Sequence, residues 1–440
     1  MFHLVHNIPA GAGAATIAGR IEAAIADGRL APAARLPTVR ELASELAVSP
    51  ATVASAYREL RQRGLISAST RRGTVVATQP PLRVRGARPL PANARDLAGG
   101  NPDPALLPPL GPALARLDAA PKLYGGPVKL ARLVELAEAD FAADQIVGDI
   151  AVAGGALDGI ERILQTRLRP GDRVAVEDPT WPRITDLVRA LGLAPDPAPV
   201  DQHGLVPDEL ARALDRGAKA VISTPRGQNP TGAALDPERG QVLRDLLARH
   251  PDVLIVEDDY AAAVAGAPYI PLHSGGHRWA VIRSLSKVLG PDLRIAPVAG
   301  DPLTISRVEG RQLLGAGWVS HLLQQTAAHL WADDATRALL ARAEATYAER
   351  RAALVAALAR HGITAHGSTG LGVWIPLPEE AAVVQQLLER GWAVSPGENY
   401  RLRTSPGIRV TTTDLQPVEA AQLAAALDEI TQTTSATYTG

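Results

Sequence analysis

Ser284-Leu285-Ser286-Lys287 follows the apolar run from Ala280 to Ile282, which predicts a buried strand, and precedes Gly290-Pro291-Asp292-Leu293-Arg294. A primary amine, two hydroxyls and a guanidinium are therefore close enough along the chain to converge on one aldehyde and one phosphate group. Lysine is rare in this sequence, which contains only Lys122, Lys129, Lys219 and Lys287. A serine-rich segment ending in lysine is more often a solvated surface segment, so its interpretation depends on the motifs around it.

Two glycine-containing motifs also follow predicted strands. Gly154-Gly155-Ala156-Leu157-Asp158-Gly159 lies between a strand and a helix, so its free backbone amides and the helix dipole can form a phosphate cradle. Gln228-Asn229-Pro230-Thr231-Gly232 follows the strand from Ala220 to Ser223 and offers Asn229 as a hydrogen-bond donor to a phenolate oxygen. Taken alone, each motif is also typical of an ordinary tight turn.

Two further motifs end predicted strands with aromatic or acidic side chains. Glu177-Asp178-Pro179-Thr180-Trp181-Pro182 ends a strand with an indole that could stack on a flat cofactor. Glu257-Asp258-Asp259-Tyr260 ends the strand from Val253 to Val256, and ligands of α/β sheets bind at such strand ends. In isolation, the tryptophan could be a core residue and the carboxylates an acidic loop.

Apolar segments separated by helical patterns predict a largely parallel sheet that helices bury on both faces. A long helical region after Ser306 then leads to two strands of a smaller C-terminal subdomain, Leu371 to Pro378 and Gly407 to Thr412. The predicted strands of the main sheet are Ile150 to Ala153, Arg173 to Glu177, Ala220 to Ser223, Val253 to Val256, Ala280 to Ile282 and Ile295 to Val298.

The N-terminal region of the chain predicts three helices. Isoleucines recur every four positions from Thr16 to Ala26, which indicates one buried helical face. A capping box over Thr38 to Glu41 starts a second helix that ends near Ala47. Ser49-Pro50 supplies an N-cap and a first-turn proline for a third helix, which Gly64 closes. Two short helices joined by a tight turn are the helix-turn-helix signature.

Two strand-like runs, Leu65 to Ser67 and Thr74 to Ala77, flank the arginine-containing turn from Ser69 to Gly73 and predict a wing. Residues 1–95 hold 13 arginines and five acidic residues, a charge of about +8, whereas the remainder holds 32 basic and 41 acidic residues, about −9. A basic head suits a polyanion such as DNA, although an arginine-rich composition alone would give the same count.

Length and composition predict the domain organisation. At 440 residues the chain is long enough for a small domain and a large domain built from two subdomains. We expect a DNA-binding domain over 1–78, a proline- and arginine-rich linker over 79–95, a large domain over 96–305, and an interdomain helix with the small subdomain over 306–440. No apolar run is long enough to span a bilayer and no signal peptide is recognisable, so a cytoplasmic protein is expected. The absence of cysteine excludes disulfides and thiolate zinc sites, and no metal site is predicted.

In this order, the five motifs of the body resemble the fold type I pyridoxal 5'-phosphate (PLP) enzymes of the class I/II aminotransferase family, over residues 96 to 430. The resemblance implies that Lys287 is the lysine of the cofactor aldimine and that Asp258, rather than Asp259, keeps the pyridine nitrogen protonated. It implies that Asn229 and Tyr260 bind the ring oxygen.

The same resemblance assigns the remaining contacts of the cofactor and of a ligand. Arg409 matches the arginine that binds a substrate carboxylate, although it could also be a surface arginine on an edge strand. Tyr124 would reach the site from the other subunit, which implies a homodimer. The stacking residue would be Trp181, and the phosphate would be held by Ala156, Leu157, Ser284, Ser286, Arg294 and Tyr124.

The head resembles the GntR family of winged helices over residues 14 to 78, through Leu36 to Leu42, Val48 to Val53 and Gly64 to Ile66. Its recognition helix departs from that family because alanine stands where many relatives place arginine or another polar residue, which puts direct base readout in doubt. The DNA-binding residues implied are Arg40, Ser49, Thr52, Arg71, Arg72 and Gly73.

A GntR head on an aminotransferase-like body is typical of the MocR (GabR-like) regulators. Gly99 to Pro104 and Gly290 to Arg294 look closest to the PtsJ-type branch. A second departure lies in Pro225 to Asn229, where relatives often carry a histidine before the Gln-Asn pair.

The resemblance implies a transcription regulator that binds double-stranded operator DNA. Its aldimine at Lys287 would sense PLP, an amine or an amino acid, and it would control genes of vitamin B6 or amino-acid metabolism. The alternative is an active aminotransferase with a vestigial head, and because every residue needed for transamination is present, weak activity stays open. A scaffold with neither activity would require both sets of motifs to be relics.

Overall fold

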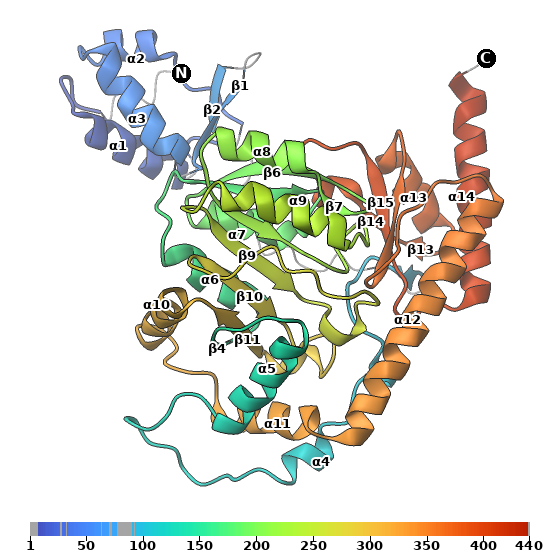
Figure 1. Cartoon of the computed structure of the whole chain (residues 1–440). Coiled ribbons are helices and arrows are strands. Elements are labelled where there is room, and N and C mark those ends of the chain that lie inside the picture. The colour runs from blue at the N-terminus through green and yellow to red at the C-terminus, as the bar shows by residue number, and fades with distance from the viewer. Residues whose placement is uncertain are drawn as a thin grey trace. The chain divides into compact units, whose positions relative to one another are not determined.

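The computed structural model describes residues 8–26, 29–31, 33–62, 64–69, 73–76, 90–91 and 93–438. The chain divides into two compact units: the first holds the N-terminal head, up to Ala87, with the short stretches Leu168–Arg173 and Asp186–Pro195, and the second holds the rest of the body. Each unit has its own hydrophobic core. Figure 1 follows the chain from blue at the N-terminus to red at the C-terminus.

Within the described residues, the head consists of three helices and a two-stranded sheet. Helix α1 spans Ala14–Ala26, α2 spans Val39–Glu45 and α3 spans Pro50–Gln62. Strands β1 (Ile66–Ser69) and β2 (Gly73–Val76) pair in antiparallel fashion. Helices α1 and α2 both pack against α3. The predicted winged helix-turn-helix is therefore confirmed.

Local hydrogen bonds explain where the helices of the head begin. The Thr38 hydroxyl accepts from the backbone N–H of Glu41, and the Glu41 carboxylate accepts from the backbone N–H of Thr38, as the capping box predicted. Ser49 Oγ accepts from the backbone N–H of Thr52 at 3.1 Å and so caps α3. The buried Tyr57 hydroxyl donates to a backbone carbonyl just before α2 and fixes α3 against that turn.

The main sheet of the body has eight strands in the order β4-β11-β10-β9-β8-β5-β6-β7. Strands β8, β9 and β10 run parallel, whereas β11 runs antiparallel to both β10 and β4. The predicted, mostly parallel α/β domain is confirmed. The strands are β4 (Asp149–Ala153), β5 (Arg173–Asp178), β6 (Ala194–Asp201), β7 (Gly204–Leu205), β8 (Ala218–Ser223), β9 (Leu254–Asp259), β10 (Trp279–Arg283) and β11 (Ala296–Gly300).

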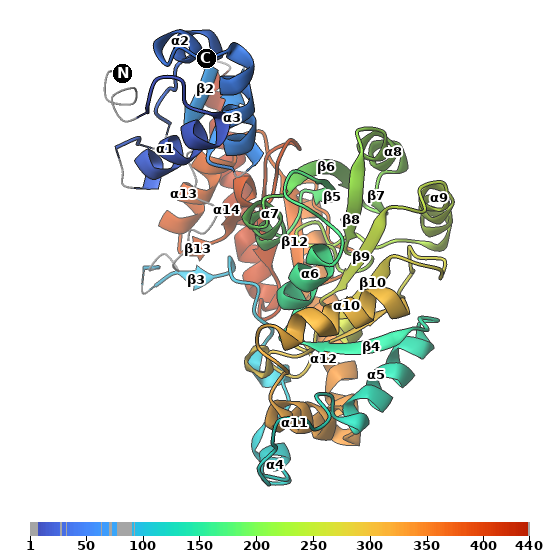
Figure 2. The ribbon, with the colours of Figure 1, turned by 90° about the vertical axis from the view of Figure 1, so that its left-hand side faces the viewer.

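Helices cover both faces of this sheet, as Figure 2 shows. Val281 and Ala299 pack in one cluster with Phe141 of α5. Their neighbours Ile282 and Val298 face the other way, towards α6, because successive side chains of a strand point to opposite faces. The helices of this domain are α4 (Gly111–Leu114), α5 (Ala131–Ala143), α6 (Ala156–Gln165), α7 (Pro182–Ala190), α8 (Pro207–Asp215), α9 (Pro237–Ala248), α10 (Pro302–Leu313) and α11 (His321–Trp331).

The smaller C-terminal subdomain is a three-stranded antiparallel sheet, in the order β12-β15-β14, with its own helices. A short strand at the start of the body, β3 (Arg95–Asp96), joins this subdomain by pairing in parallel with β13, one residue before the predicted start of the body. The remaining elements are α12 (Asp334–Arg360), β12 (Gly372–Pro376), α13 (Glu380–Glu389), β13 (Trp392–Ala393), β14 (Ser395–Pro396), β15 (Gly407–Thr411) and α14 (Pro417–Tyr438).

Candidate functional site

Three parallel strands bring the predicted motifs to one edge of the main sheet. The register pairs Ser223 with Glu257 and Ile282 with Asp258, so β8, β9 and β10 end level with one another. Asn229 lies in the loop after β8, Tyr260 directly follows β9, and β10 leads into the segment that carries Lys287. Because the carboxyl ends of parallel strands meet at one edge, these side chains are gathered in one place.

Lys287 is the amine of this cluster. Its Nζ donates a hydrogen bond to the backbone carbonyl of Gly100 at 2.6 Å. Burial lowers the pKa of Lys287 to about 8, and the positive charges of Arg409 and Arg294 act in the same direction. A lysine with a lowered pKa is partly neutral near neutral pH, and a neutral amine is the form that attacks an aldehyde.

Asp258 and Asp259 lie in contrasting surroundings. Asp258 is 3% exposed, and no described residue bonds its Oδ1. Burial raises the pKa of Asp258 to about 7, and the charges of Asp259 and Glu177 raise it further. Burial also opposes the ionisation of Asp259, but hydrogen bonds from Arg226, with the charges of Arg226 and Arg283, lower its pKa. Asp258 is therefore the carboxylate that still needs a cationic partner, such as a protonated pyridine nitrogen.

We predict that Asp258→Asn stabilises the cofactor-free protein at alkaline pH. The pKa of Asp258 is raised from 3.8 to about 7, so ionisation destabilises the fold increasingly as pH rises from about 4 to about 7, and by a constant amount above that. The variant should gain roughly 1–3 kcal/mol above pH 7, because its buried amide remains unpaired and offsets some of the gain.

Thermal melts of the cofactor-free protein from pH 5 to pH 8 measure this difference, which should shrink towards pH 5. Asp259→Asn is the matched control and should destabilise the fold, because its carboxylate accepts three hydrogen bonds from arginines. An Asp258→Asn protein that melts below wild type at pH 8 would show that Asp258 is already paired.

The predicted phosphate cradle lies at the start of α6. Gly155 has φ 109°, and a Cβ at this position would overlap the guanidinium of Arg294. Arg294 donates to the Gly154 carbonyl at 3.2 Å, which holds its guanidinium beside the cradle. The Ser284 hydroxyl is buried and accepts from the backbone N–H of Ser286 at 3.3 Å. A helix N-terminus with an adjacent guanidinium suits a phosphate.

The loop after β8 and the end of β9 contact each other directly. The Tyr260 hydroxyl donates to the Gly227 carbonyl at 2.7 Å, and burial raises the pKa of Tyr260. Asn229 Oδ1 is buried and receives no hydrogen bond from the described residues of the chain. The orphaned Asp258 oxygen is an acceptor that a protonated pyridine nitrogen would satisfy, and the orphaned Asn229 oxygen is a second acceptor open to a ligand.

Gly227 stands immediately before the Gln-Asn pair, at a position where the backbone of this chain leaves no room for a side chain. Its φ is 65°, and a Cβ there would approach the Gly370 Cα and the Ala261 Cβ to 3.2 Å each. Any side chain at this position would be strained and crowded against a second backbone.

Trp181 and Arg409 are two further residues predicted to belong to the site. Trp181 follows β5 and is half-buried. Arg409 is 4% exposed on β15, the middle strand of its sheet, and its Nη1 bonds the Tyr400 hydroxyl at 3.4 Å. The alternative that Arg409 is a surface residue on an edge strand is therefore wrong. Its charge contributes to the lowered pKa of Lys287, so the two cations face the same site.

Tyr124 does not belong to the site within its own chain. Its side chain is 91% exposed, and its ring packs edge-on against Trp318 with 5.5 Å between centroids. The expectation that Tyr124 serves the site of a second subunit stays a prediction.

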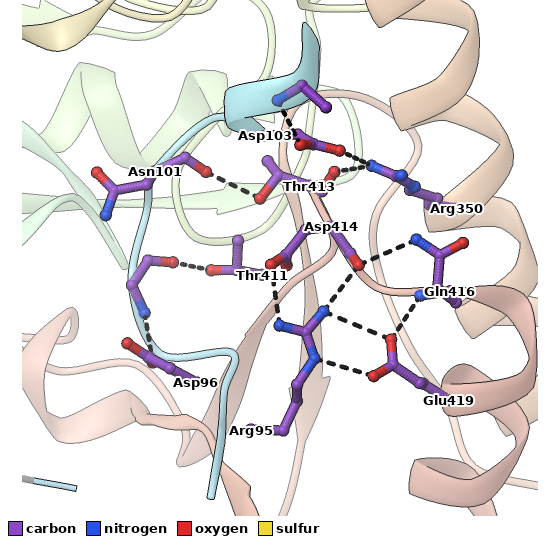
Figure 3. A network of polar contacts seen from close by, with 12 residues as sticks. Arg95, Asp96, Asn101, Asp103, Arg350, Thr411, Thr413, Asp414, Gln416 and Glu419 are labelled. Atoms are coloured by element: carbon purple, nitrogen blue, oxygen red, sulfur yellow. Dashed lines mark hydrogen bonds and ion pairs between the residues drawn. The ribbon is translucent and has the colours of Figure 1, made fainter. Parts of the chain in front are cut away.

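A segment that the sequence did not predict to be near the site runs from Arg95 to Asp103. Arg95 bonds Asp414 and Glu419, both at 2.9 Å, and so anchors the start of the segment (Figure 3). Further along, Thr411 bonds the Gly99 carbonyl, Thr413 bonds the Asn101 carbonyl and Arg350 bonds Asp103. Both ends of this segment are therefore anchored, and its middle contacts Lys287, which donates to the Gly100 carbonyl.

The head presents some of the predicted DNA-binding residues. Arg40 is exposed on α2. The hydroxyls of Ser49 and Thr52 bond each other at 2.9 Å at the start of α3, and Gly73 begins β2 with φ 73°. Arg71 and Arg72, predicted for the wing, lie outside the described residues. None of the helices that the structure describes has the length and apolar character needed to cross a membrane.

Comparison with known families supports both the head and the body. The aminotransferase class I and II family matches residues 123–427, and the gntR family of bacterial regulatory proteins matches residues 14–76. Among solved structures, the kynurenine aminotransferase of Pyrococcus horikoshii shares the fold with a TM-score of 0.72 at 22% identity, covering 78% of this chain and 92% of that one.

Two curated relatives are similar to most of this chain. The vitamin B6 salvage pathway transcriptional repressor PtsJ of Salmonella typhimurium is 41% identical over 395 residues, which cover 89% of this chain and 92% of that protein. The HTH-type pyridoxine biosynthesis transcriptional regulator PdxR of Corynebacterium glutamicum is 29% identical over 351 residues, or 76% of each chain.

Proposed function

The chain belongs to the class I and II aminotransferase family and carries a GntR-family head, as MocR-type PLP-dependent transcription regulators do, and from this we propose that it controls vitamin B6 genes in response to PLP. The observation that carries the proposal is that the similarity to PtsJ spans head and body together at 41% identity. A regulator needs both head and body, whereas an enzyme needs only the body. Because its partner is DNA, we expect the protein to act in the cytoplasm.

The bound cofactor supplies an aldehyde for an amine and a pyridine ring that withdraws electrons. Lys287 provides the amine, and burial keeps a fraction of it neutral. Asp258 would hold a proton at the ring nitrogen, while Asn229 and Tyr260 would bind the ring oxygen. Trp181 would stack on the ring. The phosphate would be bound by Ala156, Leu157, Ser284, Ser286, Arg294 and, from a second copy of the chain, Tyr124.

The contact between Lys287 and Gly100 would give the body a way to report that the cofactor is bound. A ligand that engaged the Lys287 amine would compete with its 2.6 Å hydrogen bond to the Gly100 carbonyl. Gly100 lies four residues after β3, and the chain before β3 leads to the head. Release of Gly100 would therefore be a local change in the segment that connects the cofactor lysine to the DNA-binding domain.

Transamination is the second candidate function, and Arg409 is the observation that favours it. A buried arginine next to the cofactor lysine can bind an amino-acid carboxylate in bidentate fashion. The same arginine also allows an amino acid to act as an effector without turnover, so both functions use one binding geometry.

DNA binding should depend on PLP in the full-length protein. We expect a duplex selected from random sequence by the protein to change its affinity at least tenfold when PLP is added, measured by fluorescence anisotropy. Pyridoxine 5'-phosphate, which has the ring and phosphate but no aldehyde, is the matched control and should produce a smaller change. Rapid turnover of amino acids by a protein that selects no DNA sequence would favour the enzyme.

A further inference from the structure

A buried cluster of charged side chains lies directly behind the cofactor site. Asp259 is fully buried at the end of β9 and accepts three hydrogen bonds from two arginines. Arg226 donates through Nε at 2.9 Å and Nη2 at 2.8 Å, and Arg283 donates through Nε at 2.8 Å. We call Arg226, Asp259 and Arg283 the Asp259 clasp.

Each member of the Asp259 clasp belongs to a different cofactor-binding segment. Arg226 lies in the loop after β8, three residues before Asn229. Asp259 stands between Asp258 and Tyr260. Arg283 immediately precedes the segment from Ser284 to Lys287. One carboxylate therefore links three segments that are distant in sequence and that must meet at one ligand.

Helix α5 completes the cluster from the other side. Arg283 bonds Asp140 and Asp144, both at 2.6 Å, and Arg226 approaches Asp144 at 3.5 Å. The guanidinium carbon of Arg283 lies 4.7 Å from the centre of the Phe141 ring. The negative charges of three carboxylates thus balance the positive charges of the two buried arginines. Hydrogen bonds hold both guanidiniums, and the Arg283 guanidinium also lies against an aromatic ring.

Stability alone is a poor explanation for this arrangement. A buried ion pair is costly to desolvate, and apolar residues of similar size often stabilise a fold as well or better. What paired charges provide is a fixed geometry, since a bidentate arginine tolerates little displacement of its partner. The residues that bind a cofactor need that kind of support from side chains behind them.

We propose that Arg226, Asp259 and Arg283 are positioning residues that hold the loop after β8, the end of β9 and the segment after β10 in the register that PLP binding requires. Neighbouring residues of a strand point to opposite faces, so the arginines that hold the Asp259 side chain also fix the direction in which the Asp258 side chain points. Arg226 also fixes the Gly227 carbonyl that receives the Tyr260 hydroxyl. The proposal depends on PLP binding and not on DNA binding.

Arg226→Gln tests the clasp, with Arg216→Gln as the matched control. Arg216 makes a comparable bidentate pair with the buried Asp196 of β6, at 2.7 and 3.0 Å, outside the cofactor-binding segments. We expect Arg226→Gln to raise the PLP dissociation constant at least tenfold and to shift the pH midpoint of the visible band of the bound cofactor, as loss of support behind a site commonly does. Arg216→Gln should leave both unchanged, and Arg226→Lys should recover some of the affinity.

Melting temperatures of the cofactor-free proteins separate positioning from stability. The two variants are compared by the loss of PLP affinity that accompanies a given loss of melting temperature. If this loss of affinity is no larger for Arg226→Gln than for Arg216→Gln, the Asp259 clasp only stabilises the fold and the proposal is wrong. Should Arg226→Gln fail to fold, the spectrum of Arg226→Lys decides, since an unshifted midpoint and unchanged affinity there contradict the proposal. A wild-type protein that binds PLP but no DNA would refute the proposed regulator and leave this result standing, whereas one that binds no PLP would overturn the clasp as well.

Discussion

We expect the Lys287→Ala protein to show no visible absorbance band of bound PLP, and borohydride reduction to leave no cofactor attached to it. The expected loss is complete, because no other lysine of this chain lies at the site. Lys122 pairs with Asp118 on the surface, and Lys129 bonds the Ile150 carbonyl and Glu309. Lys219 is exposed on β8. Only Lys287 combines a partly buried amine with a lowered pKa and the neighbouring Ser284, Ser286 and Arg294.

Lys129→Ala is the matched control, since it removes a half-buried lysine and should keep the visible band. The Lys287→Ala protein should also fold, and its DNA binding should no longer respond to PLP. A reducible chromophore on this variant would place the reactive amine elsewhere. A normal PLP response of its DNA binding would mean that covalent capture is not the regulatory event.

DNA affinity should fall steeply with salt and should depend on Arg40. Neutralised phosphates release counterions, so the logarithm of affinity falls with the logarithm of salt concentration with a slope of about −0.9 per phosphate. Two heads that contact about six phosphates would lose roughly a thousandfold in affinity between about 50 and about 200 mM salt. Because each copy of a dimer loses one contact, Arg40→Ala should make the slope shallower by about 1.8.

Titrations of one duplex at several salt concentrations measure that slope. Arg132→Ala is a suitable control, since Arg132 is an exposed arginine of the body that pairs with Glu135. If both variants keep the wild-type slope, Arg40 does not contact the phosphate backbone. If Arg132→Ala changes the slope as much as Arg40→Ala, the DNA contact is not confined to the head.

The sequence predicted which motifs gather at one edge of the main sheet, because each of these motifs follows a strand. The motifs that carry Asn229, Asp258 and Lys287 each come after an apolar run, and the parallel order of β8, β9 and β10 gathers them. The starts of helices α2 and α3 in the head were also predicted, because the capping box of α2 and the serine cap of α3 are local features. Local signals suffice wherever the partners of an interaction are a few residues apart.

What the sequence did not reveal depends on distant partners. Strand β6 was missed because Pro195, Pro197 and Pro199 interrupt the pattern of a strand and remove three backbone donors. Strand β3 was missed, and its first residue, Arg95, was placed in the linker, because two residues give no periodicity and only the pairing with β13 makes them a strand. The Asp259 clasp depends on the register of β9 and β10, which pairs Arg283 with Asp259. No spacing within the sequence encodes that register.

The position of β3 also determines where this protein can exchange its head for another. Arg95 is anchored to Asp414 and Glu419, and Leu97 lies fully buried in the core of the small subdomain, so the body includes these residues. A chimaera joined upstream of Leu90 should place a foreign DNA-binding domain on an intact body. A chimaera joined after Asp103 would lack strand β3 and the segment that contacts Lys287 through Gly100. We therefore expect functional chimaeras to be joined in the short stretch before β3, where a new head can be attached without removing any strand of the body.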